Sequence, residues 1–399
     1  MRRKTRKIKA VLIVLFIHLF ISLFFGVLTT VQAHATEENG RAEEKLNESI
    51  LEQINALDLQ ALQEYIRSIE YFNDKSVGER LIEYIQGEQF NYENFGKDFI
   101  RVLFEKIRKI LPTFACIASI TLLSGVISTL KSGSNVASSG EMIFLITYVG
   151  ALIPIIGVLI ECFSLTKQTI TQMQTQMQLL FPLMLTLIAA CGGNITVSVC
   201  RPAVAYFSNT IVAVVANVVL PLTVTIISFS VAGNLTKELK ITKFTAFFKS
   251  INKWIIGICI SVFGIFFTLQ GITTATYDGI VRRAAKYAIG NGIPIVGGFL
   301  SGGFDLAVAG SVLIKNSLGS LSIFLLVSIL FEPLILLISV NLLLRLTSAI
   351  TQPFGESKIS DFLGETAENL HYCTASLLFT AFMYFLSIML LVTSTEALL

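Results

Sequence analysis

Residues 316–344 read NSLGSLSIFLLVSILFEPLILLISVNLLL, a stretch whose only charged residue is Glu332. An α-helix rises about 1.5 Å per residue, so this stretch can cross the roughly 30 Å hydrocarbon core of a bilayer. Similar apolar stretches occur at 112–130, 142–160, 179–200, 203–231, 254–276, 287–304 and 372–394. We therefore predict an all-α, polytopic membrane protein with six to eight membrane-spanning or re-entrant helices.

The composition supports this class and excludes others. Hydrophobic residues make up 53% of the 399 residues and charged residues 14%, whereas soluble domains are about 25% charged. The net charge of +3 comes largely from the basic residues before residue 10, so the sequence does not indicate a nucleic-acid-binding protein. It contains no phosphate-binding GxxxxGK[ST] motif, no assignable Ser/His/Asp set and no CxxC pair. We therefore expect no enzyme activity, no cofactor and no metal site.

The first residues have the pattern of a secretory signal peptide. Basic residues at 2–9 precede an apolar run from Ala10 to Val31, which is followed by the small-x-small site Ala33-His34-Ala35. This pattern predicts a signal peptide over residues 1–35, although an apolar run of this length also suits an uncleaved anchor. In both cases, residue 36 onward is expected outside the cytoplasm.

Two regions of different composition follow. Residues 36–110 are rich in charged residues, and their apolar positions recur at helical spacing. This pattern predicts a small helical extracytoplasmic domain that serves for docking. Residues 111–399 form the predicted membrane domain.

Paired glycines interrupt two of the apolar stretches. They are Gly192–Gly193 in the first and Gly297–Gly298 with Gly302–Gly303 in the second. Each glycine costs a helix about 1 kcal/mol, so we predict helix breaks that protein or water must cover. The two stretches also begin a possible internal repeat, residues 179–276 and 293–394, of the kind found in channels and transporters. Between spans, we predict a polar loop at Thr166–Gln178, with a porous helix face as the alternative, and amphipathic linkers at Ile241–Lys253 and Ile359–His371.

Ionisable residues at membrane depth cost about 2.5–3.5 kcal/mol each and need a structural or functional reason. Glu332 is the strongest candidate for a polar conduit, or for a partner of Arg345 or Arg201. A structural ion pair or a position at the membrane interface are the alternatives. Glu161, Arg201 and Lys315 are predicted to mark segment ends. The candidate residues are Glu161, Arg201, Asp305, Lys315, Glu332 and Arg345.

The most distinctive run is YDGIVRRAAKYAIGNGIPIVGGFLSGGFDLAVAGSVLIKNSLG at 277–319, supported by LLFPLMLTLIAACGG at 179–193. With these motifs, the signal peptide and a length near 400, the chain resembles the stage III sporulation protein AE family of endospore-forming Firmicutes. In that family an acidic residue often follows the serine where this chain has Gly302, which leaves Asp305 as the acidic group of the segment.

The resemblance implies a non-enzymatic, permease- or export-gate-like subunit in the mother-cell membrane around the engulfed forespore. Its implied partners are other membrane proteins of the same sporulation operon, a secretion-type ATPase and a forespore-membrane protein across the intermembrane space. The implied role is a channel complex required for late forespore gene expression through sigma factor G. The residues themselves leave two alternatives open, an autonomous secondary transporter for a small solute and a structural membrane scaffold.

Overall fold

The computed structural model describes residues 40–67, 75–86, 95–131, 137–235, 241–292, 297–353 and 357–394. Every regular element within these ranges is helical, so the predicted all-α class is confirmed. The α-helices are α2 (Gly40–Ala56), α3 (Gln60–Arg67), α4 (Val77–Ile85), α5 (Phe95–Lys131), α6 (Ala137–Ala190), α7 (Asn194–Tyr206), α8 (Val212–Val214), α9 (Leu220–Leu235), α10 (Thr242–Gly292), α11 (Gly297–Thr351) and α12 (Ser357–Thr393). The π-helical turns η2 (Phe207–Ile211) and η3 (Val215–Val219) lie on either side of α8.

Several helices are much longer than a membrane span. In the described part of the chain, six helices are long and apolar enough to cross a bilayer. Helices α6 and α11 contain 54 and 55 residues, so each is about 80 Å long at 1.5 Å per residue. Because a hydrocarbon core is only about 30 Å thick, more than half of each helix must lie outside it.

The structure corrects two predictions about segments between the apolar spans. The predicted loop at Thr166–Gln178 lies inside α6, where threonine hydroxyls bond back to carbonyl oxygens one turn earlier, as Thr166 does to Cys162 at 2.7 Å. Such local bonds let uncharged polar residues remain helical. The predicted linker at Ile359–His371 is the first half of α12, which tertiary packing keeps continuous.

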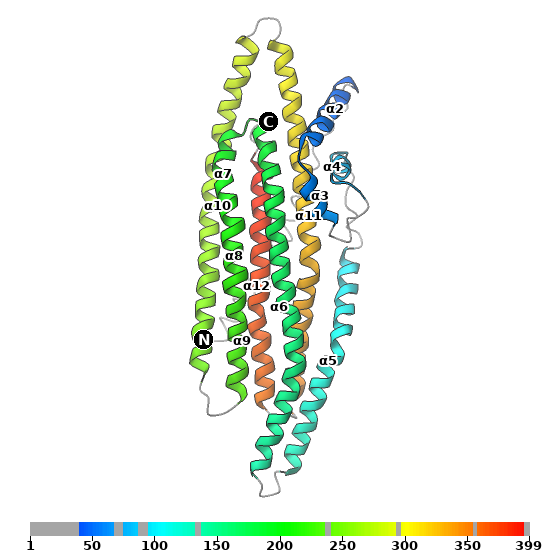
Figure 1. Cartoon of the computed structure of the whole chain (residues 1–399), viewed down its shortest axis with the longest axis vertical. Coiled ribbons are helices and arrows are strands. Elements are labelled where there is room, and N and C mark those ends of the chain that lie inside the picture. The colour runs from blue at the N-terminus through cyan, green and yellow to red at the C-terminus, as the bar shows by residue number, and fades with distance from the viewer. Residues whose placement is uncertain are drawn as a thin grey trace.

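The long helices lie side by side along the long axis of the molecule (Figure 1). Helices α5, α9 and α11 end, and α6, α10 and α12 begin, at the lower end of the view. Helix α12 packs against α11, α9 and α6. We use "lower half" for the part of the bundle that holds Met142–Ile160 of α6, and "upper half" for the part that holds Glu161–Ala190.

The three short helices α2, α3 and α4 pack on the upper half (Figure 1). Gln53 of α2 donates to the Ala307 carbonyl of α11 at 3.1 Å and accepts from Ser311 at 2.6 Å. On α3, burial raises the pKa of Tyr65 to about 12, so the phenol stays neutral beside Gln176 of α6.

The predicted domain boundary at residue 110 falls inside α5. Residues 1–39, with the predicted signal peptide, lie outside the described residues.

The paired glycines behave differently in the two stretches. Helix α6 ends at Ala190 and α7 begins at Asn194, with Gly192 at φ 87° in the turn between them. This left-handed conformation favours glycine. In contrast, α11 begins at Gly297 and runs without interruption through Gly298, Gly302 and Gly303. The helix break predicted at Gly302–Gly303 is therefore wrong. A cost of about 1 kcal/mol per glycine does not interrupt a helix that tertiary packing supports.

The proposed internal repeat stays a prediction. Its predicted first unit starts inside α6, at residue 179, and ends inside α10, at residue 276.

Candidate functional site

The exposed face of α6 changes character at one point. Below this point its exposed side chains are apolar, and from Glu161 upward they are mostly polar, as at Lys167, Thr171 and Gln178. The apolar part, 142–160, is about 28 Å long, which matches the hydrocarbon core. We therefore place a bilayer boundary between Ile160 and Glu161. The exposed apolar residues of α6 are Met142, Leu145, Ile146, Val149, Ile153, Ile156 and Ile160.

Other helices of the lower half also expose large apolar side chains. Together with those of α6 they form a surface that we call the apolar belt. Lipid tails can cover such a surface at no cost, whereas water cannot. The additional members are Leu111, Leu123 and Val126 of α5, Phe244, Phe247, Trp254 and Ile258 of α10, and Ile338, Leu342, Leu346 and Ile350 of α11. On α10, exposed apolar side chains continue above Ile258 at Ile260, Val262 and Ile265.

Glu332 lies at the edge of this belt. Its carboxylate pairs with the Lys106 ammonium of α5 at 2.6 Å, and the Glu332 side chain is 58% exposed. The exposed apolar residues of α11 begin below it at Ile338. The structure therefore gives Glu332 a partner that differs from the predicted Arg345 or Arg201, and it places the pair at the level of the membrane interface.

A group of ionisable residues is exposed within the belt itself. Asp361, Glu368 and His371 lie on one side of α12 and are exposed. Next to them, exposed Arg345 of α11 donates from its Nε to Asn341 Oδ1 at 2.9 Å, and its terminal nitrogen lies 2.9 Å from His371 Nε2. We call Arg345, Asp361, Glu368 and His371 the charged face.

Contacts between α11 and α12 fix the level of the charged face. Asn341 donates to the Ala367 carbonyl at 2.6 Å, and Ser348 donates to the Ser360 carbonyl at 2.8 Å. Exposed belt residues Leu342 and Leu346 lie on the same stretch of α11. Charged groups and lipid-facing apolar groups therefore occupy the same depth.

Behind the charged face, polar side chains join α12 to α9. The Glu365 carboxylate accepts from Ser230 and, at 3.1 Å, from Asn234. Asn369 is fully buried, and neither atom of its amide has a hydrogen-bond partner within the described ranges. In the same part of the chain, no three His, Cys, Asp or Glu side chains lie close enough together to hold a metal ion. The lower half therefore combines an apolar outer belt with polar contacts between its helices.

The upper half has the opposite arrangement. Here α12 is almost entirely buried and packs through apolar contacts, such as that of Tyr384 with Phe181 of α6. Lys315 of α11 is also fully buried, and its ammonium donates to the Val392 carbonyl near the end of α12. The last carbonyls of a helix lack intrahelical donors and attract cations, which accounts for a buried lysine here. Asp305 lies half-buried above it on α11.

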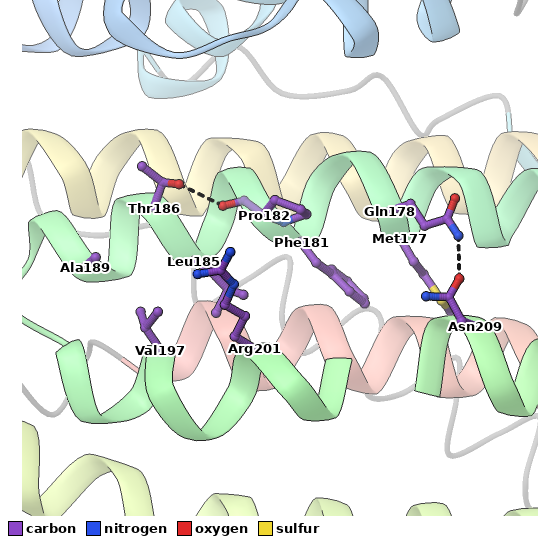
Figure 2. A pocket seen from close by; sticks show the side chains of 10 residues that line it. All are labelled: Met177, Gln178, Phe181, Pro182, Leu185, Thr186, Ala189, Val197, Arg201 and Asn209. Atoms are coloured by element: carbon purple, nitrogen blue, oxygen red, sulfur yellow. Dashed lines mark hydrogen bonds between the residues drawn. The ribbon is translucent and has the colours of Figure 1, made fainter. Parts of the chain in front are cut away.

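Arg201 lies in a groove between α6 and α7 in the upper half. The groove has a volume of about 490 Å³. In Figure 2 the residues of α6 form one wall of the groove, and Val197 and Arg201 of α7 form the other. At one end of the groove, Gln178 donates a hydrogen bond to Asn209 Oδ1 at 2.5 Å. The groove is lined by Met177, Gln178, Phe181, Pro182, Leu185, Thr186, Ala189, Val197, Arg201 and Asn209.

Comparisons with known proteins identify the family of the chain. The family model described as stage III sporulation protein AE matches residues 76–395, which is most of the chain. The chain belongs to the stage III sporulation protein AE family. Over 315 residues it is 24% identical to the stage III sporulation protein AE of Bacillus subtilis (strain 168), covering 79% of each chain. No solved structure matches it. The resemblance stated from the sequence is thereby confirmed, and this is a sporulation protein with several membrane-spanning helices.

Sequence reasoning identified Arg345 but missed the other members of the charged face. Residues 359–371 are less apolar than a membrane span, so they were interpreted as a linker outside the membrane. A signal was nevertheless available, because Asp361 and Glu368 are two helical turns apart on a segment that is continuous with an apolar span. Of the predicted candidates, the structure brings none together with another, and only Arg345 lies within the belt.

Proposed function

We propose that this chain is a non-enzymatic membrane subunit of the channel complex that connects the mother cell to the engulfed forespore and sustains late forespore gene expression through sigma factor G. Family membership supports the sporulation context. In this proposal the chain resides in the mother-cell membrane, and α2–α4 face the intermembrane space. Its partners are the other membrane proteins of the operon with their secretion-type ATPase, and a forespore-membrane protein.

The charged face is the observation that carries this proposal. An ionised side chain that faces lipid costs about 2.5–3.5 kcal/mol near the centre of a membrane. Asp361 and Glu368 make no hydrogen bond or ion pair with any residue that the structure describes. A neighbouring subunit or a shared aqueous path that covers this face would remove the cost. This favours a component of a larger membrane assembly over a chain that works alone in lipid.

The test is to neutralise the charged face and measure assembly and function together. We expect Asp361→Asn with Glu368→Gln to accumulate normally in the membrane, to lose co-purification with the operon's membrane proteins, and to lower sigma-G-dependent reporter expression. Glu161→Gln with Lys167→Gln is the matched control, because both side chains are exposed on the polar part of α6.

Two results would contradict the proposal. One is normal assembly and normal reporter expression in the charged-face variant. The other is solute uptake by the purified chain alone in liposomes, which would indicate an autonomous transporter.

A further inference from the structure

The groove between α6 and α7 is an apolar surface in a place where lipid does not cover it. Met177, Phe181 and Leu185 form its buried apolar floor, and Pro182, which is exposed, and Val197, which is half-buried, form its apolar rim. It lies above the boundary at Ile160, on the part of α6 whose exposed residues are polar. Apolar surface left in contact with water costs about 25 cal/mol per Å². A groove of this kind is stabilised when an apolar segment fills it.

Arg201 adds a charge requirement to the groove. Its side chain is exposed and makes no hydrogen bond or ion pair with the residues in the described ranges. In Figure 2 it extends from α7 toward Leu185 on α6, between the two walls. Guanidinium groups bind carboxylates strongly. The groove therefore suits a segment that combines aliphatic side chains with one carboxylate.

The end of α12 lies close to this groove. Val392 packs against Gly319 of α11, which also lies beside Met184 on α6. Met184 is next to the groove residue Leu185 in the chain and three residues from Phe181. Figure 2 shows the pale red ribbon of α12 passing behind the space between α6 and α7. Ser394 is the last residue described on this helix.

The residues after Ser394 have the chemistry that the groove requires. Residues 395–399 read TEALL, with one carboxylate at Glu396 and two leucines at Leu398 and Leu399. Five residues in extended conformation reach at most about 17 Å, which is more than the width of one helix. We propose that the groove between α6 and α7 binds segment 395–399 of the same chain, with the leucines against the apolar wall and Glu396 paired with Arg201.

Disulfide trapping in the full-length membrane protein tests this proposal. The exposed Cys116 is first replaced by serine, since the other five cysteines are buried. Leu398→Cys is then combined with Thr186→Cys at the groove, or with Ser164→Cys as the matched control. Thr186 and Ser164 are both exposed on α6, but they lie about 33 Å apart along the helix, beyond the reach of the segment.

We expect an intrachain disulfide with Thr186→Cys and none with Ser164→Cys. Adding Arg201→Glu should reduce its yield about fivefold, in line with loss of an ion pair worth about 1 kcal/mol, and adding Glu396→Lys as well should restore it. Equal yields at both positions, or no response to Arg201→Glu, would overturn the proposal. A disulfide-linked dimer in place of a linked monomer would also overturn it, because the groove would then bind the segment of a second copy.

Discussion

The same helices run through both halves of the bundle, but α6 and α12 expose side chains of opposite polarity in the two halves. In the lower half, α6 presents Ile153 and its neighbours to the outside, while α12 carries Asp361 and Glu368. In the upper half, α6 presents Lys167 and Thr171 to the outside, while α12 is buried through residues such as Tyr384. A membrane favours apolar side chains on the outer surface and tolerates polar contacts between helices, whereas water favours the reverse.

This difference explains why the helices exceed the thickness of a bilayer. A lower half that matches the hydrocarbon core needs about 20 residues per helix, and α6 continues for another thirty residues from Glu161 to Ala190. The continuation forms a helical stalk, to which α2–α4 attach through Gln53 and Tyr65. On α6, a membrane-facing part is thus joined without interruption to a water-facing part.

The largest expected effect is that of placing a charge in the apolar belt. Ile153 is 67% exposed near the middle of the apolar part of α6. We expect Ile153→Lys to raise the apparent free energy of membrane insertion by about 3 kcal/mol. The same lysine at Thr171, on the exposed polar face of α6, should have almost no effect. Equal membrane-integrated yields of the two variants would show that the two halves do not differ in solvent.

A smaller effect is expected from crowding the apolar core of the upper half. A methyl group added at Gly319 would overlap Val392 of α12, whereas one added at Gly264 of α10 would meet open space. We expect Gly319→Ala to reduce the free energy of unfolding by about 2 kcal/mol, and Gly264→Ala to raise it by up to about 1 kcal/mol. Thermal unfolding in detergent compares the two, and destabilisation by both substitutions would argue against the close contact of α11 with α12.

The smallest effect is expected at the boundary between the halves. Lys106 and Glu332 form a partly exposed ion pair, and such pairs contribute about 0.2–1 kcal/mol. A double-mutant cycle with Lys106→Ala and Glu332→Ala should give a coupling energy within this range, and Glu332→Ala should leave sigma-G-dependent expression unchanged. A severe loss of expression in a stable Glu332→Ala protein would restore the conduit role predicted from the sequence.

The sequence predicted the helical membrane class because long apolar runs such as 316–344 permit few other structures. It also located the turn at Gly192–Gly193, where the backbone requires a glycine. It failed where neighbouring helices decide the outcome. Thr166–Gln178 and Ile359–His371 are too polar for a membrane span taken alone, yet both continue a helix because α6 and α12 pack against other long helices. The Lys106 partner of Glu332 lies more than 200 residues away in the chain, so local patterns could not predict it.

The central claim is that a bilayer boundary crosses α6 between Ile160 and Glu161. It can be tested by attaching a nitroxide spin label to successive exposed positions of α6 in liposomes, from Ile153 and Ile156 to Ser164 and Thr171, in the Cys116→Ser protein. The boundary predicts that labels up to Ile160 collide preferentially with oxygen, and that labels from Ser164 onward collide with a water-soluble nickel chelate. Preferential oxygen collisions along the whole of α6, as far as Thr186, would contradict it.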